Sequence, residues 1–366
     1  MKVLLISNMY PSQKYPSYGV FVKNFVEGFE REGALIDKIV LYKEESTLLK
    51  IIKYIIFYIN IIIKGLCNDY DLVYVHYISH CAIPLIILNK FKNIKLFINV
   101  HGSDVIPEKQ SQEKFQKYVK NIIKKAYKII VPSEYFKKLV CKKYNIDMSK
   151  FIISPSGGVN EEIFYKVNDR NSLREKYNYS NDDKIIGYVS RIDVGKGWDI
   201  FLKSCDQLIN KEKKDIKVLI VGSGLQLEEF NKMLEDLKLK DKVIHLNLLP
   251  QESLRDVYNI IDVFCFPTIR DGESLGLVAL EAMACGTPVI GNDVGALSEY
   301  IENGSTGFLV NSISPVEFSD KVDYLLNDIQ FRRDEYSNRC IKIASSYFNK
   351  KVIVALYNEI KEIVNV

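Results

Sequence analysis

Short apolar runs alternate with segments of helical periodicity along most of this chain. Strands that are apolar throughout are buried on both faces, and strands separated by helices pair in parallel. The pattern therefore predicts an α/β protein built from two doubly wound parallel sheets in tandem. The predicted strands are 3–6, 39–42, 72–76, 96–100, 128–131, 151–153, 185–189, 217–221, 243–247, 263–266 and 289–290. A polar loop is predicted from Ser7 to Ser17, and the predicted helices of the second half include 198–210, about 296–302, 315–327 and 329–346.

The segment Ser154–Asn160 is rich in residues that break regular structure, and it separates the two alternating halves. A chain of 366 residues is long enough for two domains. We predict an N-terminal domain over residues 1–160 and a C-terminal domain over residues 161–347. A last helix, at about residues 348–366, is expected to pack back on the N-terminal domain.

The seven cysteines are scattered and include no Cys-x-x-Cys pair, which favours reduced thiols in the cytoplasm over a disulfide framework or a zinc site. No signal-peptide pattern is evident at the amino terminus. The longest apolar segment, Leu48–Lys64, contains Lys50, Lys53 and Asn60 and is too short to span a bilayer. A buried helix is its first interpretation, and a helix resting on a membrane surface is the alternative.

Charge is unevenly distributed between the two halves. Residues 1–165 carry a net charge of +9 and the remainder −5, which together give the overall +4. The aromatic residues of the basic half are not arranged to stack on bases, so no nucleic-acid partner is expected. A predicted helix at 112–128 carries Lys114, Lys117, Lys120, Lys124, Lys125 and Lys128. These lysines indicate either a solvated helix face or, together with the positive charge of this half, attraction to anionic lipid or to a phosphorylated acceptor.

One predicted helix is apolar on every side except at a single carboxylate. From Leu277 to Cys285 the one charged residue is Glu281, and a buried charge costs several kcal/mol unless it is paired. Glu273 lies in the preceding loop. The start of the helix lies between the two glutamates and offers free N–H groups to an anion such as a diphosphate. Glu281 could then bind the sugar hydroxyls of a nucleoside on one side of the diphosphate. Glu273 could bind the hydroxyls of the group on the other side of the diphosphate.

Two further loops suit phosphate groups. Arg191 and Lys196 follow a strand in a glycine-rich loop, where fixed cations fit a diphosphate, although a solvated basic loop is the alternative. Gly19 stands between a strand and a helix and predicts either phosphate contact or a plain turn. The pair Gly222-Ser-Gly224 lacks the full dinucleotide pattern, because Leu227 occupies the sixth position, and this counts against NAD.

Ligands in open parallel sheets bind beyond the carboxyl ends of the strands, and His76 and His101 lie at such ends. Gly102 and Asp104 extend the polar loop at His101. His245 falls inside a predicted strand, where a satisfied core or edge residue is expected. The sequence Asp69-Tyr-Asp71 spells a metal–sugar motif of a different fold, but it precedes a strand and is interpreted as a turn. We predict no metal.

Taken together, these segments resemble the retaining GT-B glycosyltransferases of family 4. The specific element is Glu273-x7-Glu281 with its flanks, and the likeness covers nearly the whole chain. The supporting pieces, in the order that the family shows, are Gly19, His101-Gly-Ser-Asp104, Pro132-Ser-Glu134, Gly157-Gly-Val159 and Arg191 to Lys196-Gly197. Two departures are visible. The common Glu-Gly-Phe-Gly is here Glu273-Ser-Leu-Gly276, and Asn160 stands where an aspartate is frequent.

The resemblance implies two Rossmann-like domains facing an interdomain cleft that holds a nucleotide-sugar, by default a UDP-sugar, without metal or other cofactor. Arg191 and Lys196 would neutralise the departing diphosphate, Glu273 would hold the hydroxyls of the donor sugar, and His101 would contact that sugar near the reacting carbon. Glu281 would hold the ribose. The other residues expected at the donor are Gly19, Asp104, Ser274, Leu275, Gly276 and Leu277.

The expected activity is transfer of a hexose to a glycan or polyprenyl-linked saccharide. The product would belong to a bacterial surface polysaccharide, such as lipopolysaccharide or capsule, made in the cytoplasm at the inner face of the cell membrane. No side chain stands out as a covalent nucleophile, so a dissociative reaction that retains configuration is expected. Two alternatives stay open: a nucleotide-sugar epimerase or hydrolase of the same fold, and a non-catalytic protein that binds nucleotides or glycans.

Overall fold

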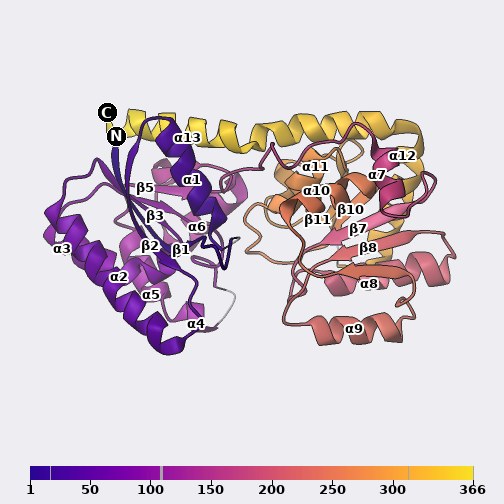
Figure 1. Cartoon of the computed structure of the whole chain (residues 1–366), viewed down its shortest axis with the longest axis horizontal. Helices are drawn as coiled ribbons and strands as arrows, with labels where there is room; N and C mark the ends of the chain where they lie inside the picture. The colour runs from indigo at the N-terminus through magenta and orange to yellow at the C-terminus, as the bar shows by residue number, and fades with distance from the viewer. Residues whose placement is uncertain (17, 108–109, 312, 366) are drawn as a thin grey trace. The chain divides into compact units, whose positions relative to one another are not determined.

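A computed structural model describes residues 1–16, 18–107, 110–311 and 313–365 and contains two compact units (Figure 1). One unit consists of Met1–Gly158 with Asn349–Val366, and the other of Val159–Phe348. Each unit is built around one six-stranded sheet in which all pairs of neighbouring strands are parallel. The sequence prediction of two doubly wound α/β sheets is therefore confirmed.

The sheet of the first unit has the strand order β2-β1-β3-β4-β5-β6. Its strands are β1 (Lys2–Tyr10), β2 (Leu35–Tyr42), β3 (Leu72–His76), β4 (Leu96–Asn99), β5 (Lys128–Val131) and β6 (Phe151–Ile153). A loop from Ser7 was predicted, and this is wrong for residues 7–10. Ser7 pairs with Val40 and Tyr10 with Tyr42, so backbone pairing carries β1 beyond its apolar run. Ser17, at the end of that predicted loop, lies outside the described residues.

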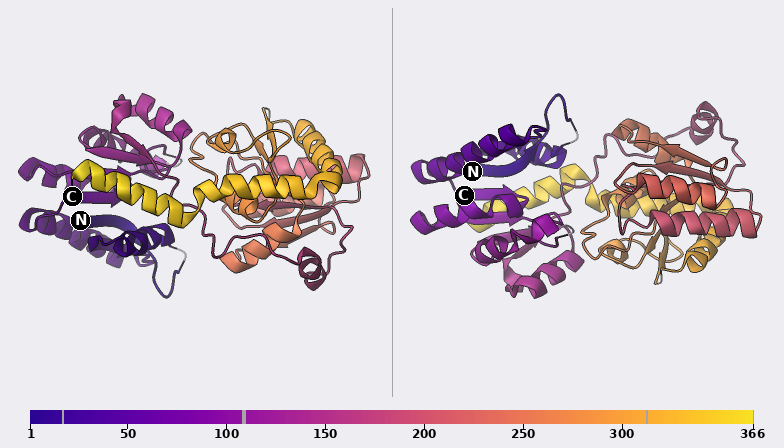
Figure 2. Two further views of the ribbon diagram at one scale, coloured as in Figure 1. Left: turned by 90° about the horizontal axis from the view of Figure 1, so that it is seen from above. Right: turned by 90° about the horizontal axis from the view of Figure 1, so that it is seen from below.

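Helices cover both faces of this sheet. On one face, α1 (Val20–Arg31) and α13 (Asn349–Val364) lie side by side (Figures 1 and 2), and the Phe29 and Tyr357 rings meet edge to face with centroids 5.4 Å apart. The other face carries α2 (Thr47–Cys67), α3 (Ala82–Phe91), α4 (Gln110–Glu113), α5 (Gln116–Ile123) and α6 (Glu134–Tyr144), with short 3-10 turns η1 (Ile78–His80) and η2 (Met148–Lys150).

Two helix predictions for this unit need correction. The single helix predicted at 112–128 is instead two shorter helices, α4 and α5, with a break between them. Because α5 ends at Ile123, Lys124 and Lys125 lie beyond it. The apolar segment Leu48–Lys64 does form α2, but a buried helix was the wrong interpretation. In α2 only Phe57, Ile61 and Gly65 are buried. Among the described residues no helix combines the length and the apolar character needed to cross a membrane.

The sheet of the second unit has the order β12-β11-β10-β7-β8-β9. Its strands are β7 (Ile185–Val189), β8 (Lys217–Val221), β9 (Val243–Leu246), β10 (Val263–Phe266), β11 (Val289–Asn292) and β12 (Gly307–Val310). The helices are α7 (Arg170–Lys176), α8 (Trp198–Asp206), α9 (Leu227–Asp236), α10 (Gln251–Ile260), α11 (Leu277–Ala284) and α12 (Pro315–Ala344).

Helix ends in this unit differ from the sequence expectation where hydrogen bonding changes pattern. The predicted helix at 198–210 ends as α8 at Asp206 and continues as the π-turn η3 (Gln207–Lys211). The helix expected at 296–302 is the 3-10 turn η4 (Leu297–Glu299). The two helices expected at 315–327 and 329–346 are joined in α12 across a non-helical residue, Arg332, and η5 (Ser345–Tyr347) follows.

A buried ion cluster ties three elements of the second unit together. Asp262, just before β10, is 3% exposed and accepts from Arg170 at 2.7 Å, from Arg174 at 2.9 Å and from Arg333. Burial alone would raise the pKa of Asp262, but the three guanidinium groups hold it below its usual range. The cluster links α7, β10 and α12 and is structural, since the aspartate also accepts the Ile185 amide at the start of β7.

Candidate active site

The turn into α11 is fixed by a glycine. β10 ends at Phe266, and the chain then loops back to Gly276, which caps α11 with φ +74°. A Cβ atom there would lie 2.7 Å from the Tyr300 hydroxyl oxygen. That hydroxyl donates to the Leu275 carbonyl at 2.8 Å and so holds the loop in place. The first N–H groups of a helix have no acceptor within it, so those of Leu277 and Val278 are available to an anion.

The structure brings two of the predicted site residues into contact in front of this turn. The Lys196 Nζ atom lies 2.6 Å from Glu273 Oε2, and the two side chains are only 12% and 13% exposed. Thr268, two residues after the end of β10, donates to the same Glu273 oxygen at 3.3 Å. Lys196 also lies over the Phe266 ring, 5.9 Å from its centroid. A lysine and a glutamate that were predicted to share a pocket are thus paired with each other.

Glu281 is buried beside a hydroxyl instead of a cation. It is 7% exposed, and its Oε2 atom accepts from the Tyr258 hydroxyl at 3.3 Å. Burial raises the pKa of Glu281 to about 8. The carboxyl group is therefore mostly protonated at neutral pH, which explains how an apolar helix tolerates it.

Arg191 lies in the loop after β7, with its side chain 55% exposed and 2.6 Å from Asp193. The other oxygen of Asp193 accepts the Leu225 amide at 2.8 Å, so this aspartate connects the loops that follow β7 and β8. Asp193, Thr268 and Tyr258 were not predicted as site residues. Only Asp193 carried a signal, since an Arg-x-Asp spacing in a loop permits a local ion pair.

The predicted donor residues Ser274 and Leu275 belong to the same loop. The Leu275 side chain is 2% exposed and packs in the core of the second unit. Its side chain therefore secures the loop, and only its backbone is placed to meet a ligand. Gly295 also borders the loop, because a Cβ atom there would lie 2.3 Å from the Glu273 carbonyl oxygen.

In the first unit, His76 and His101 lie together at the carboxyl ends of β3 and β4. The His76 Nδ1 atom is 3.0 Å from His101 Nε2, and the Phe21 ring lies 4.5 Å from the His101 ring. Burial lowers the pKa of His101 to about 3, and burial together with His101 lowers the pKa of His76. Both imidazoles are therefore neutral, so His101 can donate or accept one hydrogen bond but carries no positive charge.

Asp104 shapes the backbone on which His101 stands. It is fully buried, and one carboxylate oxygen accepts the amides of His101 and Gly102, each at 3.0 Å. The other oxygen accepts the Ile78 amide at 3.3 Å. Burial raises the pKa of Asp104 to about 6. These contacts give Asp104 a positioning role, whereas the sequence resemblance predicted that it binds the donor.

Gly19 begins α1 close to the same histidines. Its φ is +75°, and a Cβ atom there would lie 2.7 Å from the Met9 carbonyl carbon at the end of β1. The glycine therefore permits a close approach of strand and helix, two residues before the Phe21 ring that contacts His101. The predicted site residues form two groups, each at the carboxyl ends of its own sheet. The first unit holds Gly19, His101 and Asp104, and the second holds Arg191, Lys196, Glu273, Ser274, Leu275, Gly276, Leu277 and Glu281.

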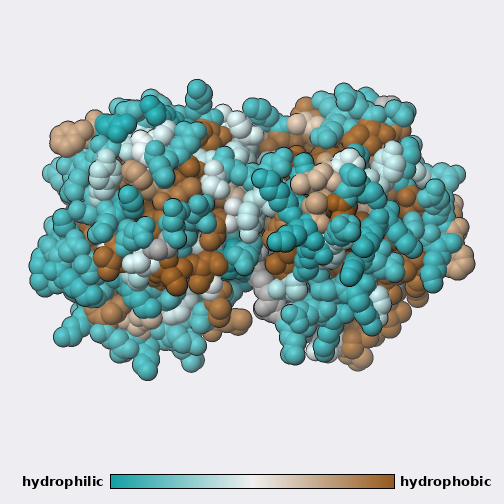
Figure 3. All heavy atoms as spheres, turned by 180° about the vertical axis from the view of Figure 1, so that it is seen from behind, coloured by the Kyte–Doolittle hydropathy of each residue, from teal (hydrophilic) through white to brown (hydrophobic). Residues whose placement is uncertain are grey.

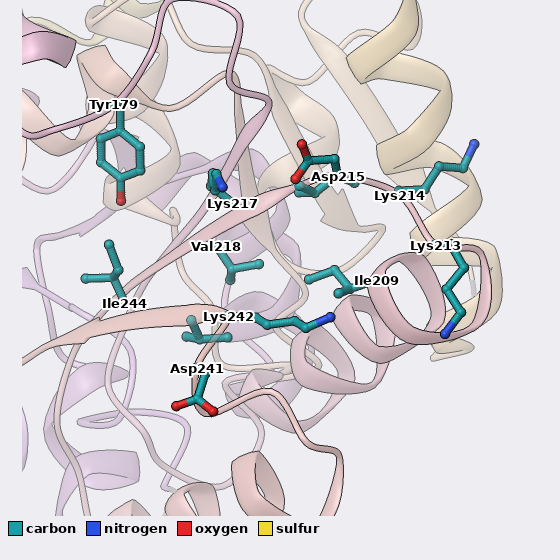
Figure 4. Close-up of a pocket in the computed structure, with 12 residues that line it drawn as sticks. Tyr179, Ile209, Lys213, Lys214, Asp215, Lys217, Val218, Asp241, Lys242 and Ile244 are labelled. Atoms are coloured by element: carbon teal, nitrogen blue, oxygen red, sulfur yellow. The ribbon is translucent and has the colours of Figure 1, made fainter.

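A cavity of about 540 Å³ lies at the opposite end of the second sheet (Figure 4). Its lining includes Lys217 and Val243, the first residues of β8 and β9. Figure 4 shows the nitrogen atoms of Lys213 and Lys214 pointing in different directions, so the lysines do not converge on one ligand. The cavity is thus separate from the predicted site.

Three smaller predictions concern residues outside the site. His245 is a satisfied residue of the edge strand β9, as predicted, with its Nε2 atom 2.8 Å from the Gly222 carbonyl oxygen. Asp69 pairs with Lys92, and Asp71 accepts the Lys2 amide, so the Asp-x-Asp motif fixes a turn. Within the part of the chain that the structure describes, no cluster of three His, Cys, Asp or Glu side chains could hold a metal ion.

Comparison with known proteins assigns both halves of the chain. Residues 169–346 match the family described as glycosyl transferases group 1, and residues 21–157 match glycosyltransferase family 4. The D-inositol 3-phosphate glycosyltransferase of Paenarthrobacter aurescens is 29% identical over 343 residues, which cover 88% of this chain and 78% of that protein. The N-acetyl-alpha-D-glucosaminyl L-malate synthase of Bacillus anthracis is 25% identical over 296 residues, which cover 80% of this chain and 74% of that protein.

Solved structures agree in fold. Sucrose-phosphate synthase from Thermosynechococcus elongatus superposes with a TM-score of 0.80 at 20% identity and covers 99% of both chains. Anabaena HepE in complex with UDP gives a TM-score of 0.77 at 17% identity over the full length of both chains. Two doubly wound parallel sheets in tandem, with these neighbours, define the GT-B fold. The chain belongs to glycosyltransferase family 4 and is a sugar-transferring enzyme, which favours this activity over the epimerase, hydrolase and binding-protein alternatives.

Proposed function

We propose that this enzyme transfers a hexose, with retention of configuration, from a UDP-sugar to a glycan or lipid-linked saccharide of a bacterial surface polysaccharide. The observation that carries the proposal is the arrangement around the start of α11. There the Lys196–Glu273 pair, the N–H groups of Leu277 and Val278, and the buried Glu281 surround one helix terminus.

Donor binding, in this proposal, replaces the internal ion pair. A diphosphate at the start of α11 competes with Glu273 for Lys196 and takes the second cation from the exposed Arg191. Glu273 is then released to accept the hydroxyls of the donor sugar. Glu281, one turn along the helix, accepts the ribose hydroxyls.

The reaction follows from this placement of charge. The bond between the anomeric carbon and the diphosphate oxygen breaks as Arg191 and Lys196 stabilise the negative charge that develops on the diphosphate. The acceptor hydroxyl attacks from the same face, its oxygen forms the new glycosidic bond, and its proton passes to the departing phosphate. His101, as a neutral imidazole, hydrogen-bonds the donor sugar. We propose no covalent intermediate, metal or other cofactor, because the two cations supply the positive charge.

Three observations bear on the substrates. The Anabaena protein with the same fold has been solved with UDP and with UDP-glucose, which supports UDP as the first nucleotide to test. Residues 1–165 carry a net charge of +9, which supports an anionic acceptor and association with the inner face of an anionic membrane. The names of two relatives favour a second acceptor class, since D-inositol 3-phosphate and L-malate are small hydroxylated anions.

The test is a panel of UDP- and GDP-sugars scored by thermal stabilisation, followed by product analysis with saccharide and small hydroxy-acid acceptors. Transfer yields free nucleoside diphosphate and a glycoside whose anomeric configuration NMR reads directly. A new nucleotide-sugar would identify an epimerase, and free sugar a hydrolase. Inverted configuration in the glycoside would refute the retaining mechanism while leaving the transferase assignment intact.

A further inference from the structure

Helix α2 presents a continuous apolar face to the surroundings of the first unit. The exposed side chains recur at helical spacing, so they fall on one side of the helix, opposite the buried Phe57, Ile61 and Gly65. We call this set the α2 face. It consists of Leu48, Leu49, Ile51, Ile52, Ile55, Ile56, Ile59, Ile63 and Leu66, each between 38% and 69% exposed.

Large exposed apolar patches on a protein mark a surface that something covers. The patch is long, because 21 residues of α2 extend about 30 Å along the helix axis. The adjoining helix α3 also exposes apolar side chains, Ile87 at 37% and Phe91 at 74%. Other apolar residues also reach the surface of the molecule, where they stand in patches among hydrophilic side chains (Figure 3).

The helix that carries the α2 face and the helices α3 and α5 contain only positive charges. The helices α2, α3 and α5, which lie side by side, contain six lysines and no aspartate or glutamate. Two of the six are paired with carboxylates from outside these helices, Lys53 with Glu44 and Lys64 with Asp37. On the opposite face of the same sheet, α1 and α13 carry both signs of charge.

We propose that the α2 face rests on the surface of an anionic lipid bilayer. An apolar helix face with lysines at its borders buries its aliphatic side chains among the acyl chains while the ammonium groups meet the headgroup phosphates. In this arrangement α2 lies parallel to the membrane plane, in keeping with the finding that no helix of the described residues is both long and apolar enough to cross. The lysines of α5, Lys117 and Lys120, face the headgroups.

Charge complementarity favours a lipid surface over a second copy of the chain. A symmetric dimer through this face would set the lysines of one copy close to those of the other, with no carboxylate on α2, α3 or α5 to separate them. An anionic bilayer offers the opposite sign across the whole patch. The proposal is independent of the donor site, so it stands or falls separately from the transferase function.

The test is flotation of the full-length protein with two kinds of vesicle, one of phosphatidylcholine alone and one with equal parts of phosphatidylglycerol. A triple variant, Ile52→Gln, Ile55→Gln and Ile59→Gln, removes the centre of the α2 face. The matched control, Ile313→Gln, Val316→Gln and Phe331→Gln, removes three exposed apolar side chains of the second unit. Thermal stabilisation by nucleotide-sugar and circular dichroism show that each variant remains folded.

We expect the wild-type protein and the control to float with the anionic vesicles, and the Ile variant to bind them at least ~100-fold more weakly. Lys117→Gln with Lys120→Gln is expected to lower anionic binding about tenfold, with a weaker dependence on salt. Negligible wild-type binding to either vesicle overturns the proposal, as does unchanged binding of the Ile variant. A concentration-dependent dimer that the Ile variant abolishes, without vesicle binding, would assign the face to self-association.

Discussion

Replacing Glu281 by glutamine is expected to raise the free energy of unfolding of the second unit, by an amount that increases as the pH rises. Glu281 has a pKa of about 8 in the folded protein, against 4.5 for a free glutamate. The folded state therefore holds this proton more tightly than the unfolded state, and the free energy of unfolding falls as pH rises from 4.5 to 8. Each pH unit is worth about 1.4 kcal/mol, so burial of Glu281 costs about 3 kcal/mol at pH 7. Glutamine keeps the shape and can still accept from Tyr258, but it does not titrate.

The assay is urea unfolding of wild type and Glu281→Gln between pH 5 and pH 8. The one tryptophan of the chain, Trp198, is buried in α8, so its fluorescence reports on the second unit alone. The stability gain of the variant should grow by about 3 kcal/mol across this range. Glu229→Gln, at an exposed position of α9, is the matched control. A gain that stays constant with pH, or a variant less stable than wild type at pH 8, would refute the reasoning.

Four further substitutions test the site and its support. Arg191→Ala and Lys196→Ala should each lower kcat by ~100-fold or more, because each removes a cation from the departing diphosphate; steady-state transfer assays measure this, and near wild-type rates would contradict it. Asp262→Ala should cost about 3–5 kcal/mol of unfolding free energy, since three arginines are left around a buried void; urea titration measures it, and Asp334→Ala at an exposed position is the control. Gly276→Ala should destabilise the second unit by about 1–3 kcal/mol and weaken donor binding, because the φ of +74° and the Tyr300 hydroxyl leave no room for a Cβ atom. Calorimetry of UDP binding measures this effect, and an unchanged Kd would show that this turn does not bind the donor.

Much of the fold could be predicted because buried parallel strands have a strong composition signal. The prediction for β1 ended too early, since residues 7–10 remain in the sheet through backbone pairing with β2, and pairing leaves no trace in side-chain periodicity. The prediction for α2 erred for a different reason. An apolar helix has the same composition whether it lies in a core or against a lipid surface, so its exposure was visible only in three dimensions.

The site could be predicted in its charged residues but not in its supporting ones. Glu281 stood out as a lone carboxylate in an apolar helix, and Lys196 and Glu273 as residues of two loops at strand ends. Their partners Thr268 and Tyr258 are common residue types in apolar surroundings, and only the packing of β10 and α10 near these glutamates reveals them. Asp104 was assigned to the donor because polar loops bind ligands, whereas its three backbone hydrogen bonds show that it shapes the loop.

Donor binding should release a proton, because the protonation of Glu281 must change when the ribose binds as proposed. At pH 7 a group with a pKa of about 8 is mostly protonated, so the empty site contains a neutral acid. A carboxylate that accepts two ribose hydroxyls is stabilised in its charged form, so its pKa falls and up to one proton leaves for each donor bound. Calorimetry of UDP binding at pH 7, in buffers of different ionisation enthalpy, counts these protons. Glu281→Gln should release fewer, and equal release by both proteins would mean that Glu281 does not meet the ribose as a carboxylate.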